Sequence, residues 1–137
     1  MIEINNLTTS KIDKSFLKKV AKIVLIGENK EEAGLSIALV GEGRIKELNK
    51  KYRGKNRVTD VLAFNGNSKF NLGLGEIVIC LSEVKKNAKI FGSTFKKELA
   101  RVLIHGILHL LGYEHEKGGG ETERMENKQE QYLKQVF

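Results

Sequence analysis

Apolar residues recur at two spacings along the chain, and these spacings predict an alternation of strands and helices. Alternating or continuous apolar stretches predict four short strands, at residues 2–4, 35–39, 61–64 and 77–81. Apolar positions three and four apart predict helices that begin after Asp13, near Ile45, after Ser82, after Ser93 or Thr94, and near Thr122. Because helices and strands interleave, we expect an α/β (α+β) fold in which about five helices pack on a small mixed sheet of four strands.

The helix that begins after Ser93 or Thr94 has the most apolar pattern. Its apolar residues are Phe95, Leu99, Val102, Leu103, Ile107 and Leu110. They leave little polar surface near the end of the helix, so we expect it to be buried at the centre of the fold. The chain has no proline, and Gly27, Gly54 and Gly92 are predicted to end the three preceding helices.

Length and composition favour a small intracellular domain. The chain has 137 residues and shows no linker or internal repeat, so residues 1–137 are expected to form a single domain. Its one cysteine, Cys80, lies in an apolar strand and is expected to be buried rather than nucleophilic. The sequence shows no signal peptide and no apolar segment long enough to span a membrane, which favours the cytoplasm.

The net charge of +7 is concentrated in one stretch of the chain. Residues 44–57 hold seven basic side chains and one acidic side chain, Glu47, so this stretch alone carries +6. The basic residues are Arg44, Lys46, Lys50, Lys51, Arg53, Lys55 and Arg57. A local basic stretch suits a polyanion such as RNA, although a solvated, lysine-rich face accounts equally well for the charge alone.

All three histidines fall within the short segment 105–115. On a helix, His105 and His109 lie on the same face with about 5–6 Å between Cβ atoms, so both rings can reach one metal ion. Gly112 is suited to end the helix because glycine accepts the left-handed conformation, and His115 can then return as a third ligand. Three unrelated histidines are the alternative, but two imidazoles on an apolar helix need partners. The spacing therefore predicts a metal site at the end of the buried helix.

Zinc, one ion per chain, is the metal that three imidazoles favour, although nickel, copper and iron accept the same ligands. Three protein ligands leave a fourth position for water, as in catalytic zinc sites. The spacing matches the metzincin protease pattern H-E-x-x-H-x-x-G-x-x-H, except that Gly106 replaces the glutamate base. This difference argues against peptide hydrolysis by that route. Glycines 118–120 are predicted to form a mobile loop near the mouth of the site.

The segment His105-Gly-Ile-Leu-His109-Leu-Leu-Gly112-Tyr-Glu-His115 resembles the H-G-x-L-H-L-x-G-Y-D-H signature of the YbeY family. Two further stretches, residues 48–64 and 75–80, agree with the family in type and order. The resemblance implies a single YbeY-like metal-dependent hydrolase domain. It also implies a zinc-dependent endoribonuclease, directed to single strands, that acts in ribosomal RNA maturation and ribosome quality control. The maturation step includes processing of the 3′ end of 16S ribosomal RNA.

The resemblance further implies roles for individual residues. His105, His109 and His115 would bind zinc, and Arg53 would complete the catalytic set by gripping a phosphate with its planar guanidinium. The residues that would attract the RNA backbone are Lys50, Lys51, Arg53, Lys55 and Arg57. The implied partners are single-stranded ribosomal RNA and the ribosome or its small-subunit proteins, with no membrane partner.

Four positions depart from the family pattern. Glu114 replaces an aspartate, Asn56 an aspartate, Val58 a proline and Ala63 a serine. The last two leave open any role for the conformation of this loop or for a hydroxyl at position 63, while Glu114 could orient a histidine or lie at the surface. Two other classes of function also stay open: a metallopeptidase with a different base, and a non-catalytic ribosome-associated factor whose metal stabilises the fold.

Overall fold

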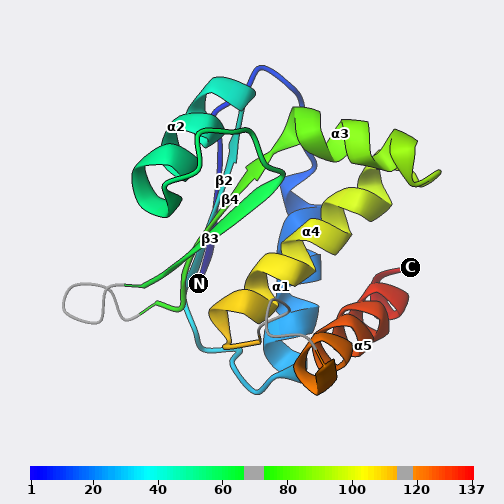
Figure 1. Ribbon diagram of the computed structural model, residues 1–137. Coiled ribbons are helices and arrows are strands. Elements are labelled where there is room, and N and C mark those ends of the chain that lie inside the picture. Colours follow the sequence, from blue (N-terminus) through cyan, green and yellow to red (C-terminus); the bar gives the residue numbers. More distant parts are fainter. Residues whose placement is uncertain (67–72, 114–118) are drawn as a thin grey trace.

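A four-stranded mixed sheet forms the centre of the computed structural model, which describes residues 1–66, 73–113 and 119–137 (Figure 1). The strands lie in the order β1-β2-β4-β3, in which β1, β2 and β4 are parallel and β3 is antiparallel to β4 at one edge. Their bounds are β1 (Ile2–Asn6), β2 (Leu35–Val40), β3 (Val61–Asn65) and β4 (Gly75–Cys80). The predicted fold class and mixed sheet are confirmed.

The helices of the described residues cover the two faces of this sheet unequally. They are α1 (Lys14–Gly27), α2 (Glu42–Arg53), α3 (Leu81–Ile90), α4 (Phe95–Leu110) and α5 (Gly119–Val136). Figure 1 shows α2 on one face and the other helices on the opposite side, with α5 packed on α1 and α4. Within the part of the chain that the structure describes, every helix is too short or too polar to cross a lipid bilayer.

Two hydrophobic cores explain the continuous apolar run of β4. Ile77 and Ile79 belong to the larger core, which includes the buried residues of α1, α4 and α5, whereas Val78 and Cys80 belong to the smaller core beneath α2. Successive side chains of a strand point to opposite faces, so a strand covered on both sides is apolar at every position. Cys80 is fully buried, as predicted.

Side-chain caps determine where α1 and α4 begin. The Asp13 carboxylate accepts a hydrogen bond of 3.1 Å from the backbone N–H of Phe16, which confirms the predicted cap of α1. The Thr94 hydroxyl accepts a hydrogen bond of 3.1 Å from the backbone N–H of Lys97. Thr94, rather than Ser93, is therefore the cap of α4, the buried helix that carries two of the histidines.

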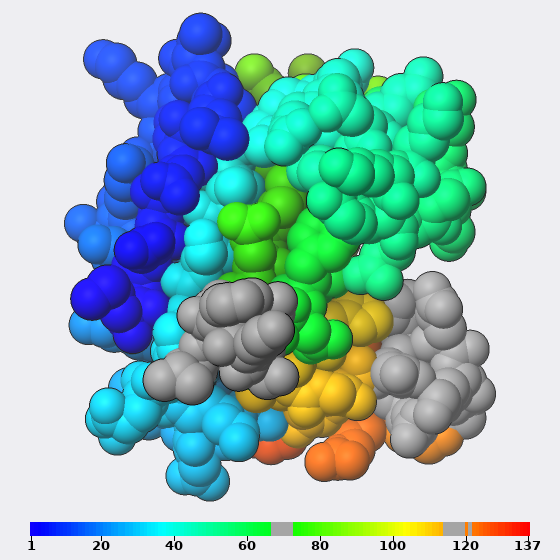
Figure 2. All heavy atoms as spheres, turned by 90° about the vertical axis from the view of Figure 1, so that its left-hand side faces the viewer, coloured from blue at the N-terminus to red at the C-terminus, as the bar shows by residue number. Residues whose placement is uncertain are grey.

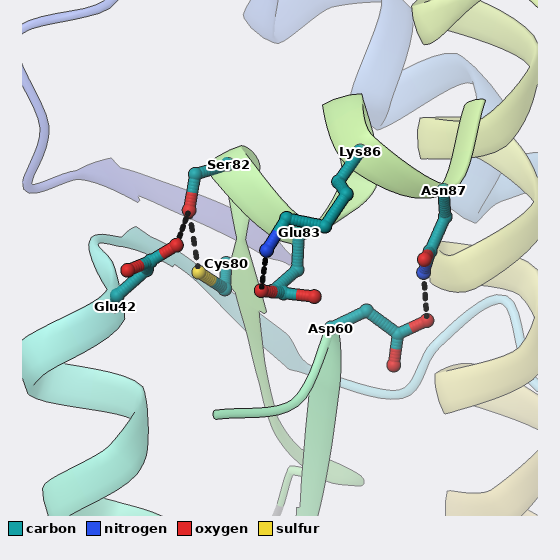
Figure 3. A network of polar contacts seen from close by, with 7 residues as sticks. All are labelled: Glu42, Asp60, Cys80, Ser82, Glu83, Lys86 and Asn87. Atoms are coloured by element: carbon teal, nitrogen blue, oxygen red, sulfur yellow. Dashed lines mark hydrogen bonds and ion pairs between the residues drawn. The ribbon is translucent and has the colours of Figure 1, made fainter. Parts of the chain in front are cut away.

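One predicted helix cap is wrong. Ser82 lies inside α3 rather than capping it, because Leu81 already forms the first residue of the helix. The Ser82 hydroxyl instead donates a hydrogen bond of 3.2 Å to Glu42 of α2 (Figure 3). The last predicted helix is present as α5, which begins at Gly119, three residues before Thr122. The predicted loop is wrong for glycines 119 and 120, because both are helical. Glycine lowers helix propensity by only about 1 kcal/mol per residue relative to alanine, which does not prevent the helix from including the exposed Gly120. Residue 118 lies outside the described residues.

Candidate active site

An open cleft of about 630 Å³ lies between the edge strand β3 and α4, beside the loop that joins α2 to β3. Figure 2 faces this side of the molecule, with α2 in turquoise above the C-terminal half of α4 in yellow. The charged and imidazole side chains that line the cleft are Arg53, Lys55, Arg57, Asp60, His105 and His109. The cleft therefore joins the basic stretch to the histidine segment, although the two are far apart in the sequence.

His105 and His109 lie on the face of α4 that lines the cleft. Both are half-buried, and their ring centroids are 4.8 Å apart with an angle of 78° between the planes. At this separation two imidazoles can bind the same ion, and imidazole nitrogens suit zinc and related transition metals. His115, the predicted third ligand, and Glu114 lie outside the described residues.

Helix α4 ends at Leu110, and Gly112, the glycine that the sequence predicts as its stop, follows two residues later. Gly112 has a φ of 98°, and its N–H donates to the carbonyl of His109, while the N–H of Tyr113 donates to the carbonyl of Leu108, both at 3.0 Å. These two bonds form a Schellman motif, which closes the helix and redirects the chain. Because residues with a Cβ are strained at this φ, glycine permits the sharp turn three residues after His109.

Gly106, between the two histidines, lets α4 pack closely on the sheet. A Cβ at this position would lie 3.1 Å from Cγ2 of Ile77 in β4, tighter than an ordinary van der Waals contact. A larger side chain would push the helix away from the strand or displace Ile77. The close packing therefore leaves little room for the glutamate base of the metzincin pattern, which supports the argument against peptide hydrolysis by that route.

The chain after α4 is anchored to Glu28, the residue that follows α1. The Tyr113 hydroxyl donates to Glu28 Oε1 at 2.7 Å, the Tyr132 hydroxyl of α5 donates to Oε2, and Lys128 Nζ lies 3.5 Å from Oε2. Burial raises the pKa of the Glu28 carboxyl, but the tyrosine hydrogen bonds and the lysine charge bring this pKa below its usual value. Glu28 thus holds Tyr113, two residues before His115, against α1 and α5.

Replacing Glu28 with glutamine is expected to destabilise the protein at neutral pH by ~1–2 kcal/mol, because two tyrosines and a lysine lose an anionic partner. A carboxyl group whose pKa is lowered by folding stabilises the protein above its usual pKa of 4.5, and this contribution is lost as the pH falls through the folded-state value. Urea unfolding of Glu28→Gln and wild type at about pH 7 and about pH 3 should show a difference that shrinks in acid. A difference independent of pH would show that the charge does not stabilise this contact.

Arg53, the last residue of α2, is docked on the edge strand. Its Nη2 donates a hydrogen bond of 2.5 Å to the carbonyl of Ala63, and its Cζ lies 5.4 Å from the ring centroid of Phe64. Ala63, which replaces the serine of the family pattern, thus contributes its carbonyl rather than a hydroxyl. The contact uses one of the five N–H donors of the guanidinium, so the group is held beside the cleft with donors left for an anion.

The other predicted RNA-binding residues fall into two groups. Lys55 and Arg57 line the cleft, whereas Lys50 and Lys51 are exposed on α2 outside its lining. The buried side-chain amide of Asn49 donates a hydrogen bond of 3.0 Å to the carbonyl of Arg57, which fixes the loop against α2. Asn49 is not among the site residues that the sequence predicts, because nothing in the local pattern identifies its partner.

Asp60 is the one acidic side chain among the lining residues that the structure describes. Its Oδ2 accepts a long hydrogen bond of 3.4 Å from Asn87 of α3 (Figure 3). Its backbone carbonyl accepts a hydrogen bond of 2.9 Å from the N–H of Cys80. Burial raises the pKa of the Asp60 carboxyl, and the charge of Arg101 opposes that rise only in part. Asp60 therefore ties the start of β3 to α3 and places a carboxyl group in the cleft wall, a role that sequence reasoning missed.

The fold and the cleft define an α/β protein in which two histidines share a cleft with the basic side chains of Arg53, Lys55 and Arg57. Comparisons with known proteins identify its family. The family model described as Endoribonuclease YbeY matches residues 3–137. The Endoribonuclease YbeY of Thermodesulfovibrio yellowstonii is 44% identical over 119 residues, which cover 85% of this chain and 74% of the relative. That of Thermotoga maritima is 41% identical over 131 residues, which cover 93% and 83% of the two chains.

A solved structure agrees with these sequence matches. The solution structure of TM1509 from Thermotoga maritima superposes with a TM-score of 0.69 at 36% identity, and the match covers 99% of this chain and 89% of that one. The chain therefore belongs to the YbeY family of endoribonucleases, and the resemblance drawn from the histidine segment is confirmed.

Proposed function

We propose that this chain is a zinc-dependent endoribonuclease that cuts single-stranded RNA during maturation of ribosomal RNA and in ribosome quality control. The observation that carries the proposal is a single cleft lined by the histidine pair of α4 and by Arg53. Relatives named Endoribonuclease YbeY support the class of reaction. This function would place the chain in the cytoplasm, with the ribosome or its small-subunit proteins as partners.

Zinc would be held by His105 and His109 together with His115. The two described imidazoles share a helix face at a separation that suits one transition-metal ion, and the turn at Gly112 favours a return of the chain toward them. A bound zinc ion supplies Lewis-acid chemistry, because it stabilises negative charge on a phosphoryl oxygen and makes water more acidic.

Arg53 would bind a phosphate of the RNA strand at the cleft. Its docking on Ala63 orients the guanidinium, whose planar fork of donors matches a phosphate better than the single ammonium of a lysine does. A cation held in place before the reaction also stabilises the charge that develops on the phosphoryl group. Lys55 and Arg57 would add attraction for the backbone inside the cleft, and Lys50 and Lys51 would extend it over α2.

An exposed aromatic ring next to Arg53 suits an unpaired base. Tyr52 is 56% exposed, its ring meets that of Phe64 edge-on at 5.4 Å, and Lys51 Nζ lies 5.2 Å from its centre. Stacking of a base on such a ring contributes about 1–3 kcal/mol. In a fluorescence-polarisation titration, Tyr52→Ala should therefore bind single-stranded RNA about tenfold more weakly, and Tyr52→Phe should bind as wild type does. Equal affinity of the alanine variant and wild type would remove Tyr52 from the RNA-binding surface.

The proposed activity can be tested with three substrates in parallel. Zinc-loaded protein should cut a labelled single-stranded RNA, leave the matching RNA duplex largely intact, and leave casein intact. A chelator should stop RNA cleavage and added zinc should restore it. Cleavage of casein with intact RNA would instead favour the metallopeptidase, and RNA cleavage that persists after complete metal removal would contradict a metal-dependent nuclease.

A further inference from the structure

Helix α5 places the buried side-chain amide of Gln129 beside His105 of the histidine pair. Gln129 Oε1 lies 2.9 Å from Nδ1 of His105, and Gln129 is only 8% exposed. Gln129 lies on the buried face of α5 with Met125, Tyr132 and Leu133, and this helix packs on α4. The amide is therefore held at the imidazole by the packing of two helices, and its position does not depend on a surface loop.

We propose that Gln129 is a positioning residue that sets the tautomer of His105 for metal binding, an inference that rests on the metal site proposed above. The amide oxygen is a hydrogen-bond acceptor, so it selects the imidazole form that carries its proton on Nδ1. The lone pair of the neutral ring then lies on Nε2, the nitrogen that binds the ion. A protein group that accepts from the second nitrogen also fixes the ring plane and raises the basicity of the ligand.

The opposite orientation of the amide has a different consequence. If the Gln129 side chain donated its N–H to Nδ1, the proton of a neutral His105 ring would lie on Nε2. Neither nitrogen could then bind a metal ion without breaking that hydrogen bond or losing a proton. The contact therefore either prepares His105 as a ligand or blocks it, and the tautomer of His105 distinguishes the two cases.

Two substitutions at Gln129 show whether the side chain acts by accepting the hydrogen bond from His105 or only by filling space. Gln129→Glu keeps an acceptor at nearly the same position, whereas Gln129→Met keeps the size and helix propensity but lacks the amide oxygen. Loss of such a partner typically weakens metal binding by about 10–100-fold. We expect that loss for the methionine variant, and zinc affinity at or above the wild-type value for the glutamate variant.

The test combines two measurements on the full chain. Imidazole ¹⁵N NMR of chelator-treated protein reports the tautomer, and the chain holds only three histidines to assign. Zinc affinity is measured by competition with a chromophoric chelator. Wild type and Gln129→Glu should carry the His105 proton on Nδ1, and Gln129→Met should lose this preference together with its affinity. If the methionine variant does not fold, the wild-type tautomer and the glutamate variant still decide the question.

Several outcomes overturn the proposal. A proton on Nε2 of His105 in the wild type, or wild-type zinc affinity in a folded Gln129→Met variant, would show that Gln129 does not position the ligand. If the wild type binds zinc in that experiment, the proposed metal site survives and only the role of Gln129 fails. A wild-type chain that binds no zinc would overturn the metal site and the role of Gln129 together.

Discussion

Alanine in place of His109 is expected to abolish zinc binding and to reduce cleavage of single-stranded RNA by about a thousandfold, the upper end of the range for loss of a charge-stabilising group. His109 supplies one of the two described imidazoles at the cleft, and a zinc site with two remaining protein ligands binds weakly. The fold should persist, because the side chain is half-buried in the last turn of α4 and is not part of the hydrophobic core.

The His109→Ala experiment needs zinc content, cleavage rate and thermal unfolding measured on the same samples. Lys97→Ala is the matched control, because Lys97 is exposed on the same helix and lies outside the cleft lining. The control should resemble wild type in all three measurements. A folded His109→Ala variant that has lost zinc but processes ribosomal RNA normally would contradict the nuclease mechanism and favour a non-catalytic factor.

Alanine in place of Arg53 should leave zinc content unchanged and lower RNA cleavage about 100- to 1,000-fold, because one preorganised donor to the phosphoryl group is removed. The structure explains why RNA cleavage should fall while zinc content stays unchanged. Arg53 lies on α2 and contacts Ala63 and Phe64 of β3, whereas the histidine pair lies on α4. Arg53→Lys should recover only part of the activity, since an ammonium lacks the bidentate geometry of a guanidinium.

Arg44→Ala provides the comparison for Arg53→Ala. Arg44 lies on the same helix, is paired with Glu47 at 2.6 Å, and is outside the cleft lining. Arg44→Ala removes one positive charge, as Arg53→Ala does, but outside the cleft lining. It should therefore weaken RNA binding only slightly, through the loss of long-range attraction. Equal losses of activity in the two variants would mean that net charge, rather than the position of Arg53, matters. Full activity of Arg53→Ala would show that Arg53 takes no part in the mechanism.

Individual helices and strands can be predicted from the sequence where the pattern of apolar residues matches the faces that are buried. The apolar pattern of α4 predicts a buried helix, which packs against three other helices and against β3 and β4. The continuous apolar run of β4 predicts a strand that is covered on both faces. The order of strands in the sheet is not predicted, since it depends on contacts between distant segments. The wrong cap at Ser82 has a local cause: β4 passes directly into α3, so no residue is left between them for a side-chain cap.

The site is predictable in part for a similar reason. The histidine pair and the turn at Gly112 are encoded by spacing within one segment, and the structure places both as expected. Asp60 and Gln129 could not be found in this way, because each acts through a partner on another element. Gln129 in particular reads as an ordinary polar residue of an amphipathic helix, and only the packing of α5 on α4 brings it to His105.

X-ray absorption at the zinc edge, on zinc-loaded wild type and His115→Ala, shows whether three histidines bind one zinc ion. We expect three imidazole nitrogens and one oxygen at about 2.0–2.1 Å from the zinc in the wild type, and one imidazole fewer in the variant. A wild-type spectrum with only two imidazoles, or one that His115→Ala leaves unchanged, would contradict the three-histidine site.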